Sequence, residues 1–105
     1  RSSAWKVGMA NDYLNKVTDN VNLEIQTART SLAQAIKQVD LTGSSLEKAR
    51  ENEQKALERY EEGKISIMEV IEAQNYRQAS QINYVQAKVS AQSSYSGLIK
   101  ALHNY

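Results

Sequence analysis

The sequence contains no cysteine, no proline and no phenylalanine, and it has only four glycines among 105 residues. Without cysteine the chain has no disulfide framework, no thiolate metal site and no thiol nucleophile. An interior proline costs a helix about 3 kcal/mol, so a proline-free chain can stay helical over its whole length. The alternation of β-branched and polar residues that is typical of strands is also missing. We therefore predict an all-α fold in a single domain.

Strong charge and long apolar runs are missing as well. Thirteen basic residues stand against twelve acidic ones, which leaves a net charge of +1 without a basic patch. Binding to a nucleic-acid backbone is therefore not expected. No apolar run approaches the ~20 residues of a membrane span, and no secretory segment opens the chain. Because the chain begins with Arg1, we interpret it as an excised or processed piece of a longer protein.

Residues 61–69 carry the signals of a tight reversal between two helices. Gly63 is suited to the positive φ that follows many helix C-termini. Ser66 and Glu69 have the spacing of a capping box, in which the hydroxyl and the carboxylate each accept a backbone N–H. Ile65 and Val70 are placed to form a hydrophobic staple. These three signals agree on one turn.

The predicted fold is a long antiparallel helical hairpin, or coiled coil. We expect an outgoing helix over residues 10–62, a tip turn at residues 62–66 and a returning helix over residues 66–102. At 1.5 Å per residue the rod should be roughly 60–90 Å long. Residues 1–10 contain Gly8 and are expected to fray.

The outgoing helix carries apolar residues on alternating three- and four-residue steps. We call this heptad pattern the outgoing seam, and it predicts supercoiling against a neighbouring helix. Its members are Val17, Val21, Ala28, Leu32, Ala35, Val39, Leu46, Ala49, Ala56 and Tyr60. Many of them are alanines, so the neighbouring helix should approach closely.

One interruption leaves an alternative open. Gly43 is followed by a second Ser-x-x-Glu pattern, from Ser44 to Glu47, which could end one helix and begin another in a three-helix bundle. The heptad register nevertheless continues through this point, whereas a loop would reset it. We favour one continuous helix, locally kinked near residues 42–45, because glycine next to serine is a known kink site.

The returning helix carries two apolar stripes rather than one. The Ile82 stripe consists of Met68, Ile71, Ile82, Val85 and Val89. The Ala87 stripe consists of Ala73, Tyr76, Ser80, Tyr84, Ala87, Ala91, Tyr95 and Leu98. A helix with a single neighbour needs one stripe. Two stripes predict two helical neighbours, so the hairpin should belong to a wall of helices or to an oligomer.

Signals of catalysis are weak. The single histidine, His103, has no acidic neighbour in sequence and is interpreted as a surface residue. Glu69 and Glu72 share a helical face and could act as an acid–base pair, but a helix cap beside a solvated face explains them better. We interpret the tyrosines of the Ala87 stripe as packing residues rather than a platform for bases. No enzyme activity, cofactor or metal site is expected.

Residues 56–74 (ALERYEEGKISIMEVIEAQ) resemble the hairpin-tip signature of the TolC-like outer membrane efflux proteins. In that family an arginine-tyrosine pair precedes a glycine and a serine or threonine, and an acidic-valine-leucine-x-alanine-glutamine run follows. The flanking alanines and the ending Leu98-Ile99-Lys100-Ala101-Leu102 are similar too. The likeness covers nearly the whole chain, as the second periplasmic hairpin of one protomer.

The resemblance implies a part of a homotrimeric duct in a Gram-negative outer membrane. In such ducts a periplasmic barrel of helical hairpins meets an adaptor protein and an inner-membrane pump, while β-barrel segments cross the membrane. It also implies an entrance gate formed by Tyr60, Glu69 and Glu72. The adaptor-facing tip would consist of Gly63, Lys64, Ile65 and Ser66.

Two departures and two alternatives accompany the resemblance. Some family members lock the gate with a basic residue where this chain has Ile65, and Lys64 is the nearest substitute. The usual glycine after the final alanine-leucine is His103 here.

The first alternative is a free-standing structural or adaptor coiled coil that binds a protein partner through its tip. An enzyme or metal-binding bundle is a more distant one.

Overall fold

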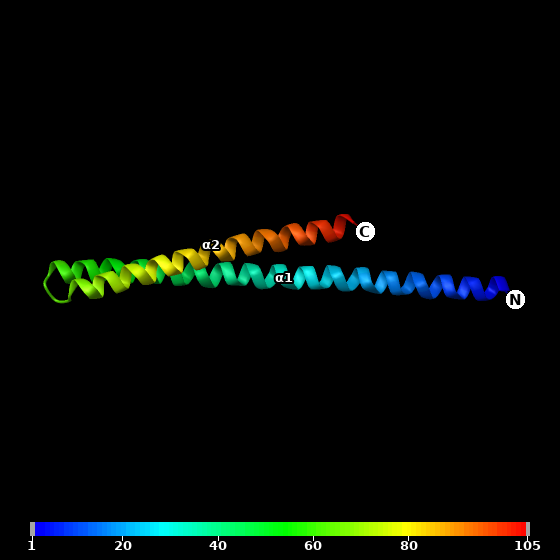
Figure 1. Ribbon diagram of the computed structural model, residues 1–105, viewed down its shortest axis with the longest axis horizontal. Helices are drawn as coiled ribbons and strands as arrows, with labels where there is room; N and C mark the ends of the chain where they lie inside the picture. The colour runs from blue at the N-terminus through cyan, green and yellow to red at the C-terminus, as the bar shows by residue number, and fades with distance from the viewer. Residues whose placement is uncertain (1, 105) are drawn as a thin grey trace.

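Two long helices form a single antiparallel hairpin. The computed structural model describes the backbone of residues 2–104 and the side chains of residues 6–104. Helix α1 (Ser2–Glu61) and helix α2 (Ile67–His103) are joined by a short turn, and no strand occurs within residues 2–104. They form a rod of 92 × 17 × 15 Å (Figure 1). The predicted all-α hairpin is confirmed.

Helix α1 is longer at its start than expected and is unbroken in its middle. It begins at Ser2 rather than near residue 10, because a single glycine such as Gly8 costs too little to end a helix. It also continues through Gly43 as one rod (Figure 1), so the three-helix alternative is wrong. At this point the hydroxyl of Thr42 donates to the Gln38 carbonyl oxygen at 2.7 Å, which satisfies the hydroxyl within the helix.

The outgoing seam faces α2 along most of its length, as predicted. Leu46 and Ala49 are buried at its centre, and Ala49 is fully inaccessible. The members from Val21 to Ala56 are all buried or half-buried. The two outermost members, Val17 and Tyr60, are exposed, because Val17 lies beyond the end of α2 and Tyr60 lies beside the turn.

The two stripes of α2 have different surroundings. Most of the Ala87 stripe packs against α1, and Ser80 and Ala87 are buried. Its Tyr76 and Tyr95 are exposed, so Tyr84 is the one tyrosine of this stripe that is half-buried within the hairpin. An α-helix drifts by about 20° per heptad relative to a seven-residue repeat, which moves Arg77 and Ser94 into the inner positions.

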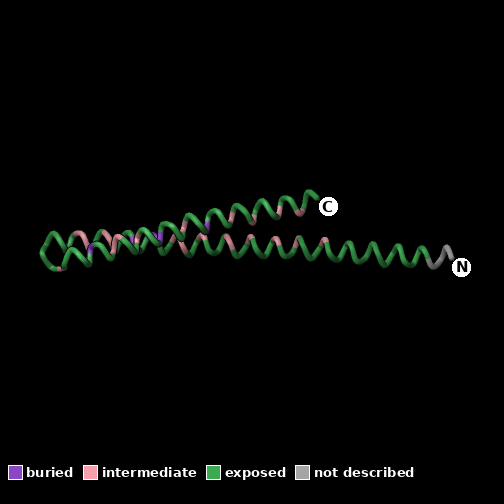
Figure 2. The backbone as a smooth tube through the Cα atoms, in the orientation of Figure 1, coloured by how far each residue is buried: buried purple, intermediate pink, exposed green. Residues whose placement is uncertain are grey.

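The Ile82 stripe lies in solvent. Its five members, with their exposed fractions, are Met68 at 60%, Ile71 at 39%, Ile82 at 58%, Val85 at 49% and Val89 at 57%. Figure 2 shows that burial is confined to the line where the two helices meet. The hairpin therefore leaves the apolar residues of this stripe without a neighbour, which is the under-packing expected from two stripes.

Helix α1 also extends past the end of α2. The two helices contain 60 and 37 residues, and the N-terminal part of α1 projects beyond the C-terminus (Figure 1). Apolar residues on this projection are exposed, among them Val7 at 61% and Leu14 at 59%. The tip turn therefore lies at the fully paired end of the rod.

Candidate functional site at the hairpin tip

The tip begins where glycine ends α1. Gly63 has φ +75°, and nothing lies within 4 Å of the place that its Cβ would occupy. The Gly63 N–H donates to the Tyr60 carbonyl oxygen at 2.9 Å, and the Lys64 N–H donates to the Arg59 carbonyl oxygen at 2.8 Å. This pair of bonds is a Schellman motif, which needs a left-handed residue at Gly63. The predicted role of Gly63 is confirmed.

Helix α2 begins at the predicted cap. Ser66 has an extended backbone, and its Oγ accepts a hydrogen bond from the Glu69 N–H at 3.4 Å. The reciprocal bond from the Ser66 N–H to the Glu69 carboxylate is not formed in the described chain, so only half of the capping box is present. The Glu69 carboxylate still lies in the first turn, where the helix dipole favours negative charge.

The predicted staple residues have inward positions. Ile65 is half-buried, and Val70 is 2% exposed and is the largest fully buried side chain among the described residues. Burying such a side chain contributes about 1.5–3 kcal/mol. The apolar contacts of the tip thus lie just behind the turn, and they leave the polar residues of the turn in solvent.

The three predicted gate residues lie on both sides of the turn. Tyr60 is in the last turn of α1 and is 44% exposed. Glu69 and Glu72 lie three residues apart on one face of α2, and both are exposed. Neither these carboxylates nor the Tyr60 hydroxyl has a side-chain hydrogen bond or ion pair with another described residue. Their polar groups are therefore available to a partner molecule.

The predicted adaptor-facing residues form the turn itself. Lys64 Nζ lies 2.7 Å from Glu62 Oε2, and both side chains are more than half exposed. Because both side chains of this ion pair lie in solvent, water strongly screens the attraction between their charges. In the hairpin alone Lys64 thus pairs with Glu62 rather than with Glu69 or Glu72.

Sequence reasoning missed two features near the tip. Ile67 is 48% exposed and extends the Ile82 stripe to the turn, where it adds an apolar patch beside the charged residues. In addition, Arg77 Nε donates to Glu53 Oε2 at 2.7 Å across the hairpin, and both side chains are about one quarter exposed or less. The signal for this pair was present, because Glu53 occupies an apolar position of the heptad and a charge there needs a partner.

Several chemistries have no support in the described part of the chain. Residues 2–104 contain no group of three or more His, Cys, Asp or Glu side chains arranged to hold a metal ion. Neither described helix has a stretch apolar and long enough to cross a bilayer. The single histidine, His103, is the exposed last residue of α2. What the tip offers is a charged and partly apolar contact surface.

Comparisons with known proteins do not assign the chain to a family. The chain matches no family model, no curated protein and no solved structure.

Proposed function

We propose that this hairpin is a wall segment of a TolC-like outer membrane efflux duct, in which its tip forms part of the entrance gate and of the adaptor-docking surface. The role is mechanical, and it involves no catalysis or cofactor. The observation that carries the proposal is the exposed Ile82 stripe, which runs along α2 on a face that α1 does not cover.

A barrel wall gives each helix two neighbours. In the hairpin α2 has one, and its second apolar face lies in water, where an extended apolar surface marks an interaction site. The stripe runs from Met68 to Val89, with the polar Asn75 and Gln78 in register between Ile71 and Ile82. That shape suits a second helix packed alongside rather than a compact ligand. Adjacent hairpins of a homotrimer would supply such helices.

The tip supports the remainder of the proposal. Its likeness to the TolC-like signature includes the Gly63 turn and the Ser66 cap, and both have the local geometry that the signature needs. Glu69 and Glu72 place two free carboxylates at the end of the rod. In a ring of hairpins these carboxylates would surround the entrance, where they would attract cations and repel one another.

The proposed partners and location follow from this role. The tip would contact a periplasmic adaptor protein, through which an inner-membrane pump would be joined to the duct. The hairpin would be the periplasmic portion of a Gram-negative outer membrane protein.

A second candidate is a free-standing coiled coil that binds one protein partner through its tip. The exposed Ile67 and Met68, beside the Glu62–Lys64 ion pair, favour a tip contact of this kind. The two candidates differ in the size and location of the native protein. In the first the hairpin is part of a large outer membrane protein, whereas in the second it is a small protein without a membrane anchor.

Fractionation of the source cells tests the proposal. An antibody raised against the hairpin should detect a protein several times larger than 11.8 kDa in the outer membrane fraction. A band close to 11.8 kDa in the fraction without membranes would overturn the duct and favour the free-standing coiled coil. An inner-membrane pump protein serves as the control for separation of the two membranes.

A further inference from the structure

The hairpin is packed unevenly along its length. We define the tip half as residues 43–87 and the base half as residues 21–39 and 91–103. All buried residues of the described chain lie in the tip half: Leu46, Ala49, Val70, Ser80 and Ala87. In the base half the residues that face the other helix are only half-buried, although the heptad spacing of α1 continues there unchanged.

Open grooves run along the junction of the two helices in the base half. One groove of about 610 Å³ runs between Ala28 on α1 and Gly97 on α2. A second, of about 650 Å³, lies nearer the tip, between Leu32 and Tyr95. Figure 1 shows the two ribbons diverging toward the C-terminus. A smaller groove of about 300 Å³ lies between the helices in the tip half, beside Ser45 and Tyr76. The tip half is thus the more closely packed of the two, and the base half is the more open.

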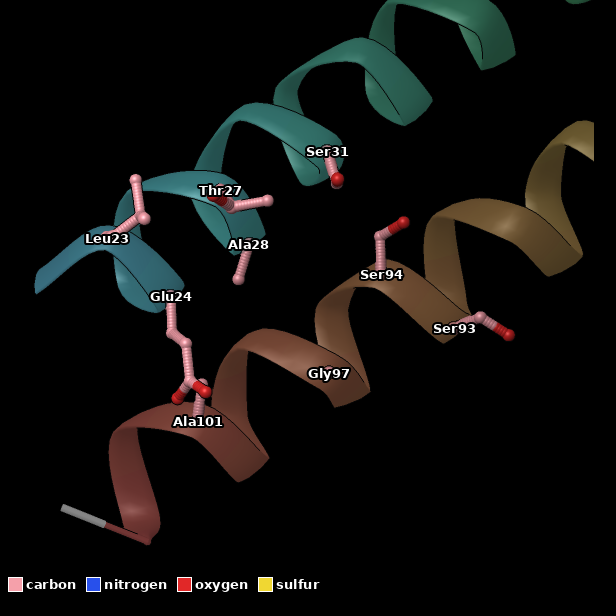
Figure 3. Close-up of a pocket in the computed structure, with 9 residues that line it drawn as sticks. All are labelled: Leu23, Glu24, Thr27, Ala28, Ser31, Ser93, Ser94, Gly97 and Ala101. Carbon is pink, nitrogen blue, oxygen red and sulfur yellow. The ribbon is translucent and has the colours of Figure 1, made fainter. Parts of the chain in front are cut away.

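Most of the residues that line the first groove are small, although Leu23 and Glu24 border it as well. Small residues line it from both helices: Ala28 and Ser31 on α1, and Ser94, Gly97 and Ala101 on α2. In Figure 3 the side chains of Ala28, Ser31 and Ser94 point into the space between the helices. Facing small residues permit the closest approach that two helices can make, so the open groove has room to close.

Tyr84 lies at the boundary between the two halves. Its Cε1 atom is 3.2 Å from the place where a Cβ on Gly43 would be, so the ring rests directly on the backbone of α1. Lys88 Nζ lies 4.4 Å from the centre of the same ring. The ring therefore fills the space beside Gly43 where the two helices meet at the boundary.

Polar contacts between the helices are present only on the tip side of Tyr84. Arg77 and Glu53 form the one cross-helix ion pair among the described residues. The described side chains of the base half make no hydrogen bond or ion pair between α1 and α2. Nothing polar fixes the spacing of the base half.

We propose that Tyr84, seated on Gly43, is the fulcrum of a conformational device. The tip half keeps its packing, while the base half moves between the open arrangement and a closed one in which Ala28 and Ser31 meet Ser94 and Gly97. Closure replaces water in the groove by apolar contact, and opening restores hydration to the serines. The device belongs to the hairpin itself, so it does not depend on the proposed function.

Distance measurements between pairs of spin labels test this device. One pair, at Arg29 and Lys100, spans the base half, and a control pair, at Arg50 and Gln78, spans the tip half; all four positions are exposed. The labelled chain is mixed with an excess of unlabelled chain so that only distances within one hairpin are recorded. We expect two distances, or one broad distribution, for the base pair and a single narrow distribution for the tip pair.

Variants at the fulcrum show whether Tyr84 controls the motion. Tyr84→Ala removes the ring and should shift the base distribution to shorter distances, whereas Tyr84→Phe should leave it unchanged. Gly43→Ala pushes against the ring and should shift the distribution to longer distances. The tip pair reports in each variant whether the hairpin is still folded. A base distribution as narrow as that of the tip pair, or one that neither Tyr84→Ala nor Gly43→Ala moves, would overturn the proposal.

Discussion

The ring of Tyr84 on α2 lies against the backbone of Gly43 on α1, at a distance that a methyl group on Gly43 would crowd. In the sequence this glycine resembles a helix break. In the fold it lies inside an unbroken helix, where the absence of a side chain makes room for an aromatic ring of the neighbouring helix.

This contact predicts that two glycine-to-alanine changes differ in their effect. Gly97→Ala should raise the free energy of unfolding by about 1 kcal/mol, because alanine is the better helix former and nothing lies within 4 Å of the new methyl group. Gly43→Ala gains the same helix propensity, but its methyl group would lie 3.2 Å from Tyr84 Cε1. We expect this clash to cancel the gain. Urea unfolding measures both, and equal stabilisation by the two changes would show that the ring is not held against α1.

Substitution of Gly63 in the turn should destabilise the hairpin for a different reason. Gly63 has φ +75° with open space around it, so Gly63→Ala introduces backbone strain without a side-chain clash. The change should lower the free energy of unfolding by about 1 kcal/mol. Gly63→Asn should cost less, because asparagine tolerates this conformation better. Thermal unfolding followed by circular dichroism compares the three chains, and an alanine variant as stable as the parent would argue against the left-handed turn.

The cross-helix ion pair predicts a contrast with the ion pair of the turn. Arg77→Gln leaves the Glu53 carboxylate on a mostly buried seam without its partner, and it should lower the free energy of unfolding by about 1–2 kcal/mol. Lys64→Gln breaks the exposed pair with Glu62 and should have no measurable effect. Salt should weaken the Arg77 contribution only slightly, because the pair is largely shielded from water. Equal effects of the two variants in urea unfolding would contradict this assignment.

Much of the hairpin could be predicted from local chemistry. The tip was predictable because its signals are short-range: Gly63, Ser66 and Val70 each act within one helical turn. The facing surfaces were predictable from heptad spacing, since Leu46 and Ala49 lie where that spacing places them. The second stripe of α2 indicated an uncovered face, and Ile82 and Val85 lie in solvent as expected.

Other features depend on contacts between distant parts of the chain. Two contacts between the helices join Glu53 to Arg77 and Gly43 to Tyr84. To predict them one must know how far the two helices are shifted along each other, and residue spacing within one helix does not give that shift. The exposure of Tyr76 and Tyr95 follows from helical drift relative to the heptad repeat. Half of the capping box is missing, and the Glu69 side chain is exposed.

The proposed gate predicts a change in conductance. If Tyr60 and Glu72 hold the entrance closed, then the double variant Tyr60→Phe, Glu72→Gln in the assembled duct should raise its single-channel conductance in a planar bilayer. The loss of a hydroxyl and a carboxylate removes the polar groups through which neighbouring tips would hold one another. A matched double variant at Glu51 and Lys55, on the exposed side of α1, should leave the conductance unchanged. Unchanged conductance in the Tyr60 and Glu72 variant would remove these residues from the gate.

In the native protein we expect another helix to cover the Ile82 stripe. Because the chain has no cysteine, a single introduced thiol reports on one position without background. The direct measurement is the rate at which a maleimide labels Val85→Cys in isolated source-cell membranes, compared with Glu51→Cys on the exposed side of α1. We predict slow labelling at position 85, fast labelling at position 51 and equal rates after denaturation. Labelling of Val85→Cys as fast as that of Glu51→Cys in the native membranes would contradict the account.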